Sequence, residues 1–181
     1  MITLRQIINN MSKGQSAISV RYILQGLDSV YQSLAPGIQI LGAKKSGNKS
    51  TIFLSIPSEK DLNKRYFVAV ELDTIEKFTL DTKLKVFTNS PGFLFNFAYV
   101  FHQSNALLYP GKIPSEFLTM PPKTRNPYAV AGFNKQIYAA IKYIGHSNLA
   151  SILETYDGQP LPTVPTVRFQ VNRANGKTEL V

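Results

Sequence analysis

The chain has 181 residues, of which 44% are hydrophobic and 17% charged, and its formal net charge at pH 7 is +9. This length predicts one domain spanning 1–181, with 157–181 as an extended C-terminal tail. The absence of cysteine excludes disulfides, thiolate metal sites and cysteine nucleophiles, and two histidines are too few for a three-histidine metal centre, so we expect neither metal nor cofactor.

Two amphipathic helices are predicted at the start of the sequence. The first ten residues lack the basic-then-apolar order of a signal peptide, so we expect a protein made in a reducing cytoplasm. Apolar residues recur with helical spacing over 4–11, with Thr3 as the cap and Gln6 as its capping-box partner. A second apolar stripe predicts a helix over 18–34 that ends before Pro36-Gly37.

The spacing of apolar residues then changes to that of β-strands, and we expect these strands to form a mainly antiparallel sheet. Apolar, β-branched runs at 38–43 and 51–56 predict a hairpin around a turn at 46–48. Two further strands are predicted at 66–72 and 83–87 from their alternating pattern. Helices before and after these strands place the chain in the α+β class.

The most apolar stretch, Phe93–Phe101, fits two secondary structures. Its aromatic residues alternate as in a strand, yet several of them also keep helical spacing. Ser90 as a cap and Pro91 at the first helical position favour a helix, and we expect the stretch to be buried in either form. The run is far shorter than the roughly 20 residues of a membrane span, so we expect no membrane partner.

Proline dominates the next part of the sequence. Five prolines within 110–127 predict an irregular arm that runs over the surface. A helix is predicted from about Gly132 to Ile144 with Gly145 as its stop, followed by a short helix or turn over 147–156. A last strand is predicted within 164–171.

Two segments carry most of the positive charge. Residues 42–65 hold six Lys or Arg against two Asp or Glu, and residues 112–142 hold five against one. Such segments are consistent with phosphate contacts to DNA, with a solvated surface, or with an acidic protein partner. If the partner is DNA, the candidate phosphate-binding residues are Lys44, Lys45, Lys49, Lys64 and Arg65.

Only one weak arrangement suggests catalysis. Glu71 and Asp73 share a strand face, and with Asp61, Asp81 and Lys83 they loosely resemble the acid–acid–lysine set by which nucleases hold Mg²⁺. Solvated carboxylates paired with nearby lysines explain the same residues more simply. The sequence has no phosphate-binding loop and no nucleophile elbow, so we expect a protein that is not an enzyme.

The Pro-rich arm supplies candidate interface residues instead. Arg and Tyr are enriched among the residues that dominate binding energy, and a proline-rich segment loses little entropy when it docks. The candidate interface residues are Lys123, Arg125, Pro127 and Tyr128.

Three motifs give the sequence a resemblance to known proteins. They are Ser-Pro-x-Phe-x-Phe-x-Phe-Ala-Tyr at 90–99, Pro-Pro-Lys-x-Arg-Asn-Pro at 121–127, and Gly-Phe-x-Lys-x-Ile-Tyr at 132–138. Together they resemble poorly characterised virion and structural proteins of large tailed bacteriophages, over about residues 86–144. The resemblance implies a viral origin and a place in the virion, and it brings no catalytic residues.

These observations together favour a non-enzymatic virion structural protein, a subunit of a neck, tail or capsid assembly. It is expected to be made in the host cytoplasm and to contact other virion proteins or further copies of itself through the Pro-rich arm and the tail. A basic DNA-binding protein is the alternative, and a Mg²⁺-dependent nuclease is a third.

Overall fold

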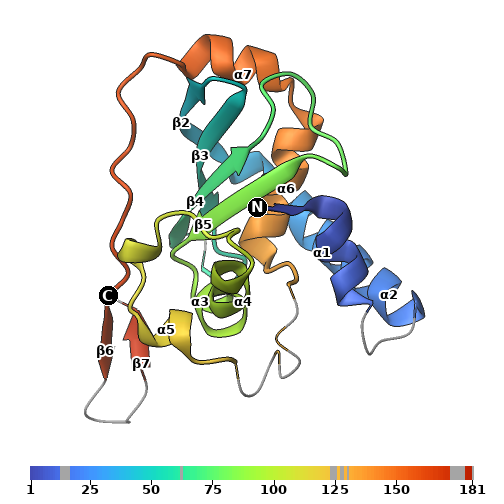
Figure 1. The fold of residues 1–181 in the computed structure, drawn as a ribbon, viewed down its shortest axis with the longest axis vertical. Helices are drawn as coiled ribbons and strands as arrows, with labels where there is room; N and C mark the ends of the chain where they lie inside the picture. Colours follow the sequence, from blue (N-terminus) through green and yellow to red (C-terminus); the bar gives the residue numbers. More distant parts are fainter. Residues whose placement is uncertain are drawn as a thin grey trace.

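A computed structural model describes residues 1–12, 17–61, 63–122, 126, 129, 131–171 and 178–180. Figure 1 shows a twisted antiparallel sheet with helices behind it and at its sides. The described elements confirm the α+β class and the N-terminal helices. Within these residues no helix is long and apolar enough to cross a bilayer.

The main sheet has five strands in the order β1-β5-β4-β3-β2, and every neighbouring pair is antiparallel. The predicted hairpin and the two strands after it are confirmed, each slightly longer than expected. Gly47, with a φ of +59°, allows the tight reversal between β2 and β3. The strands are β1 (Ile2–Thr3), β2 (Gln39–Ser46), β3 (Lys49–Pro57), β4 (Arg65–Leu72) and β5 (Lys83–Thr88).

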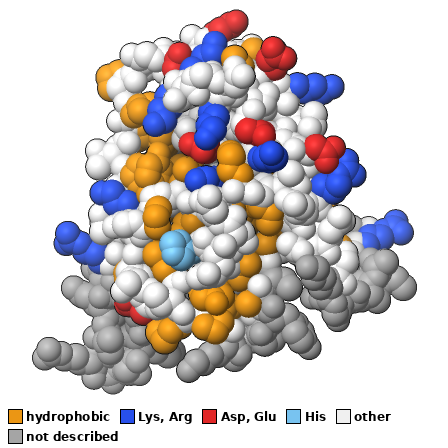
Figure 2. Space-filling view, in the orientation of Figure 1, with side chains coloured by type: hydrophobic (Ala, Val, Ile, Leu, Met, Phe, Trp, Pro, Cys, Tyr) orange, Lys and Arg blue, Asp and Glu red, His pale blue; other side chains and the backbone are white. Residues whose placement is uncertain are grey.

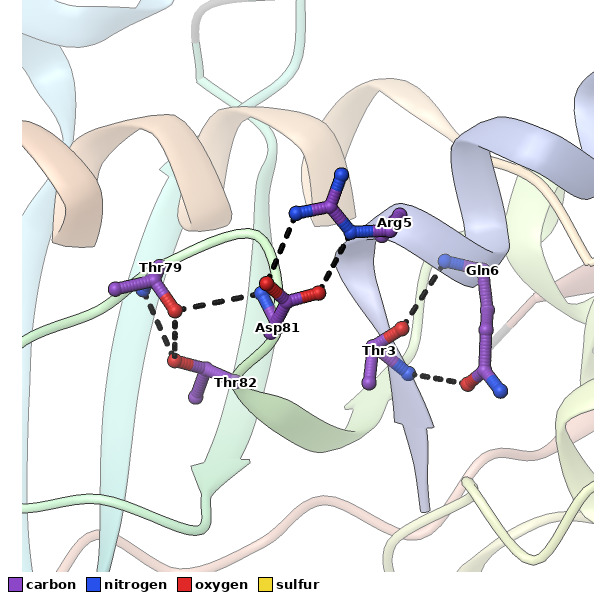
Figure 3. A network of polar contacts seen from close by, with 6 residues as sticks. All are labelled: Thr3, Arg5, Gln6, Thr79, Asp81 and Thr82. Atoms are coloured by element: carbon purple, nitrogen blue, oxygen red, sulfur yellow. Dashed lines mark hydrogen bonds and ion pairs between the residues drawn. The ribbon is translucent and has the colours of Figure 1, made fainter.

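Helix α1 (Leu4–Met11) begins as the sequence predicts. Gln6 N–H donates to the Thr3 hydroxyl at 3.1 Å, and Thr3 N–H donates to Gln6 Oε1 at 2.9 Å, which completes the capping box. On the same helix, the Arg5 guanidinium makes two hydrogen bonds to Asp81, in the loop between β4 and β5 (Figure 3). These contacts hold the loop against the start of the chain.

The sheet has two differently covered faces. Its back face carries Ile52, Val70 and Val86 and is covered by α6 (Lys135–His146), which lies behind the sheet in Figure 1. Its front face carries a row of contacting aromatic rings that continues into the segment after α4. The rings of this row are Phe53, Phe67, Phe87 and Tyr109.

The ambiguous aromatic stretch is helical, which confirms the favoured alternative. It forms two short helices, α3 (Pro91–Asn96) and α4 (Ala98–Gln103), separated at Phe97. The expectation that the whole stretch is buried is wrong, because Phe95 lies on the outer side of α3 and is 45% exposed. Ser90 precedes α3 as predicted, yet its side chain makes no capping hydrogen bond.

The Pro-rich segment is less extended than expected in its described part. It contains a 3-10 turn at Pro110–Lys112 and the short helix α5 (Glu116–Thr119), and it buries Ile113 and Leu118 in the core. These two apolar side chains hold the segment against the body of the protein. Farther on, Asn126 is buried and its Nδ2 donates to the carbonyl of Asn96 at 2.8 Å.

The remaining helices correct two predicted boundaries. Helix α6 starts at Lys135, three residues later than expected, because Asn134 caps it. It also passes through Gly145, so the predicted stop there is wrong: Ser147 N–H donates to the Tyr143 carbonyl and closes the last turn after His146. The short helix predicted next is α7 (Leu149–Tyr156).

The last predicted strand is confined to three residues and does not join the main sheet. Residues 157–168 have no helix or strand, and the strand β6 (Phe169–Val171) pairs only with β7 (Thr178–Leu180). Figure 1 shows this pair at the far end of the molecule from α7.

Candidate functional site

The structure separates the five candidate phosphate-binding residues into three places. Lys44 and Lys49 share the front face of the sheet. Lys44 on β2 pairs with Thr51 on β3, and Lys49 lies two residues from Thr51 on the same strand, so all three side chains face the same side. Lys45 follows Lys44 on β2 and therefore faces the other side of the sheet; its backbone N–H donates to Asp157 Oδ1 at 2.8 Å. Lys64 lies just before β4, and Arg65 is its first residue. Seven residues, or roughly 23 Å, separate Arg65 from Leu72, at the end of β4 that lies near Lys49.

Arg65 is engaged within its own fold. Its Nε donates to the Ser55 hydroxyl at 2.7 Å, and its Nη2 donates to the carbonyls of Gly37 and Ser55. Lys64 lies over the ring of Tyr66. These side chains support the end of β3, and they do not extend the surface formed by Lys44 and Lys49.

Two lysines that are not among the five candidate phosphate-binding residues join that surface. The strand register aligns Lys44, Thr51, Glu71 and Lys85 in one row across β2, β3, β4 and β5. Lys83 lies two residues from Lys85 on β5 and therefore faces the same side. We call Lys44, Lys49, Lys83 and Lys85 the lysine patch. Figure 2 shows Lys and Arg side chains, with Asp and Glu side chains among them, over the upper part of the molecule.

The amine of Met1 lies near three of these lysines. The pKa of the Met1 amine is lowered, first by burial and then by repulsion from Lys85, Lys83 and Lys49. The amine donates to the carbonyl of Asn105 at 2.6 Å, and Lys85 Nζ donates to Asn105 Oδ1 at 3.2 Å. Loop residue Asn105 therefore sits at the edge of the lysine patch.

The carboxylates of the possible Mg²⁺ set are dispersed. Asp81 pairs with Arg5, Asp73 Oδ1 accepts the backbone N–H of Lys83 at 2.7 Å, and Asp61 Oδ1 accepts the N–H of Asn63. Glu71 approaches Lys49 only at 3.9 Å. In the part of the chain that the structure describes, no three His, Asp or Glu side chains are grouped as metal ligands.

The candidate interface residues Lys123, Arg125, Pro127 and Tyr128 lie outside the described residues. The segment leading to them borders an apolar groove of about 640 Å³ between α3, α4 and α5. Phe95 and Met120, 45% and 56% exposed, lie on its wall. The groove is further lined by Leu94, Tyr99, Phe117, Pro121 and Pro122.

A polar ladder joins α6 to α2 (Ala17–Leu34) behind the sheet. The Tyr138 hydroxyl donates to Asp28 Oδ1 at 2.6 Å, and Lys142 Nζ lies 3.0 Å from the same oxygen. One turn farther along, the Tyr31 hydroxyl contacts His146 Nδ1 at 3.1 Å. The hydrogen bond from Tyr138, assisted by Lys142, lowers the pKa of Asp28, while burial and the same bond raise the pKa of Tyr138.

The lowered pKa of Asp28 predicts a pH-dependent contribution to stability. The ionised carboxylate stabilises the fold above its ordinary pKa of 3.8, and this contribution is lost as pH falls through the lower folded-state pKa. We expect Asp28→Asn to lower Tm by about 2–4 °C at pH 7, the shift of a partly exposed interaction of ~1 kcal/mol. The difference should shrink as the pH falls below 3.8 and vanish once Asp28 is protonated in the folded protein, measured by thermal unfolding across the pH range. A difference that stays constant with pH contradicts this role.

Comparison with known proteins does not add to this geometry: no family model, no curated protein and no solved structure matches the chain.

Proposed function

We propose that the chain is a non-enzymatic structural subunit of a bacteriophage virion, in a neck, tail or capsid assembly, and that its C-terminal segment joins it to its neighbours. The observation that carries this proposal is the β6–β7 pair at the end of a segment without helix or strand. The resemblance of residues 86–144 to virion proteins of tailed bacteriophages agrees with it.

The C-terminal segment contacts the body of the protein at more than one point before β6. Val167 is 4% exposed, and its N–H donates to the carbonyl of Lys112 at 2.8 Å. Upstream, Pro162 lies against Gly42 on β2, where an added Cβ would come within 3.1 Å of the proline ring. These contacts guide the segment along the molecule toward the β6–β7 pair.

The β6–β7 pair needs support from another element. A two-stranded sheet is at best marginally stable in water, and it gains stability from a third strand or from packing on a helix. Among the described residues no third strand pairs with β6 or β7. A neighbouring subunit that adds a strand or a packing surface supplies this support, as in β-strand addition.

The location of the protein tests this function. Quantitative mass spectrometry of purified particles of the phage that encodes the chain should find it at a fixed, integral copy number per particle. It should stay with the particles through density-gradient purification. Detection only in the lysate of infected cells, with none in the particles, contradicts the proposal.

A further inference from the structure

The lysine patch has less compensating charge than the three cation sites of the fold that form close ion pairs. Arg5, Lys135 and Lys142 each pair with a carboxylate, those of Asp81, Glu59 and Asp28. Within the described part of the chain, Lys44 and Lys83 have no ion pair. Two carboxylates lie among the four lysines: Glu71, 3.9 Å from Lys49, and Asp73, which accepts a backbone N–H.

The patch is also wide. Lys44 and Lys85 are three strand spacings apart, or roughly 14 Å, and Lys49 and Lys83 extend the patch along the strands. This width is similar to that of the major groove of duplex DNA, about 12 Å.

The polar residues at the edge of the patch match the usual partners of phosphate oxygens. Asn105 bonds to Lys85, and Ser46 pairs with Lys49 across the hairpin, next to the exposed Asn48. Lysine, serine and asparagine are among the side chains that contact phosphate oxygens in protein–DNA complexes. The neighbouring aromatic residue, Tyr109, is partly buried and packs edge-on against Phe87, so it offers no open platform for an unpaired base.

We propose that the lysine patch binds the phosphate backbone of duplex DNA without regard to base sequence. This contact is separate from the assembly role of the β6–β7 pair, which lies at the far end of the molecule from α7 (Figure 1). Each lysine that neutralises a phosphate releases bound counterions, so the logarithm of affinity should fall with the logarithm of salt concentration with a slope of about −3 to −4.

The test compares two triple variants with the same change in charge. Lys44→Gln, Lys83→Gln and Lys85→Gln together alter the patch, whereas Arg21→Gln, Lys60→Gln and Lys64→Gln alter exposed cations elsewhere. Binding of a mixed-sequence 30-base-pair duplex is followed by fluorescence anisotropy at several salt concentrations. The patch variant should bind at least tenfold more weakly with a slope smaller by about 3, and the matched variant should change affinity less than about threefold.

A third variant is expected to raise the affinity for DNA instead of lowering it. Glu71→Gln removes the carboxylate at the centre of the row, so it should tighten DNA binding severalfold while leaving thermal stability nearly unchanged. Circular dichroism and thermal unfolding of every variant establish that the fold is retained.

Three outcomes overturn the proposal. They are equal losses in both triple variants, weaker binding by Glu71→Gln, and the absence of wild-type binding to the duplex at low salt. If poly-glutamate binds the patch and duplex DNA does not, an acidic protein is the partner instead. The oligomeric state of the protein is measured in a separate experiment, so a lysine patch that does not bind DNA leaves the assembly proposal standing.

Discussion

Replacement of Phe87 by alanine is expected to destabilise the protein by about 3–5 kcal/mol, the usual cost of removing a buried aromatic ring. Phe87 is fully buried on β5, and its ring contacts Phe67 at 6.1 Å and Tyr109 at 5.9 Å between centroids. It joins the front face of the sheet to the segment after α4. Its loss therefore leaves a cavity and removes two ring contacts at once.

Urea unfolding at constant m-value measures this effect. Phe87→Leu keeps most of the buried volume and should cost clearly less than alanine. Tyr22→Ala is the control for an exposed aromatic side chain: Tyr22 is 70% exposed on α2, so its loss should change stability by less than about 0.5 kcal/mol. If the free energy of unfolding of Phe87→Ala lies within about 1 kcal/mol of the wild-type value, the aromatic row is not a stabilising core.

Asn134 is the second position where a single change should have a large effect. It is 7% exposed and caps α6, because its Oδ1 accepts the N–H of Ile137 at 2.9 Å. Its Nδ2 donates to the Ser90 hydroxyl at 2.6 Å and to Gln136 Oε1 at 3.0 Å. One side chain thus links the start of α6 to the start of α3.

Asn134→Ala should destabilise the protein by about 2–4 kcal/mol, from the lost cap and from buried polar groups left without a partner. Asn134→Asp is the matched variant. It keeps the acceptor for Ile137, places a negative charge at a helix N-terminus, and can accept a bond from Ser90, so it should cost less. Chemical unfolding ranks the two, and an aspartate variant as unstable as the alanine variant contradicts the capping role.

The fold was predictable where the signal is local. The capping box of Thr3 and Gln6, the alternation of β4 and the turn at Gly47 each depend on a few consecutive residues, and the structure confirms them. The stop at Gly145 was predicted wrongly because glycine permits a left-handed cap without requiring one. Here the helix continues for one more residue.

The lysine patch was only half predictable. Lys44 and Lys45 are consecutive on a strand, so the period of two already places them on opposite faces, a signal present in the sequence. The addition of Lys83 and Lys85 depends on the register between β4 and β5, which the sequence does not specify. The Asp28–Tyr138 contact joins residues 110 positions apart and has no sequence signal.

The central claim, assembly through the C-terminal segment, is tested most directly by the mass of the protein in solution. Light scattering after size-exclusion chromatography compares the chain with a variant that ends at Arg168, which retains the hydrogen bond between Val167 and Lys112. We expect the full chain to form a defined oligomer at high concentration and the shortened chain to be a monomer of unchanged thermal stability. A full chain that stays monomeric, or a shortened chain with the same oligomeric mass, contradicts the claim.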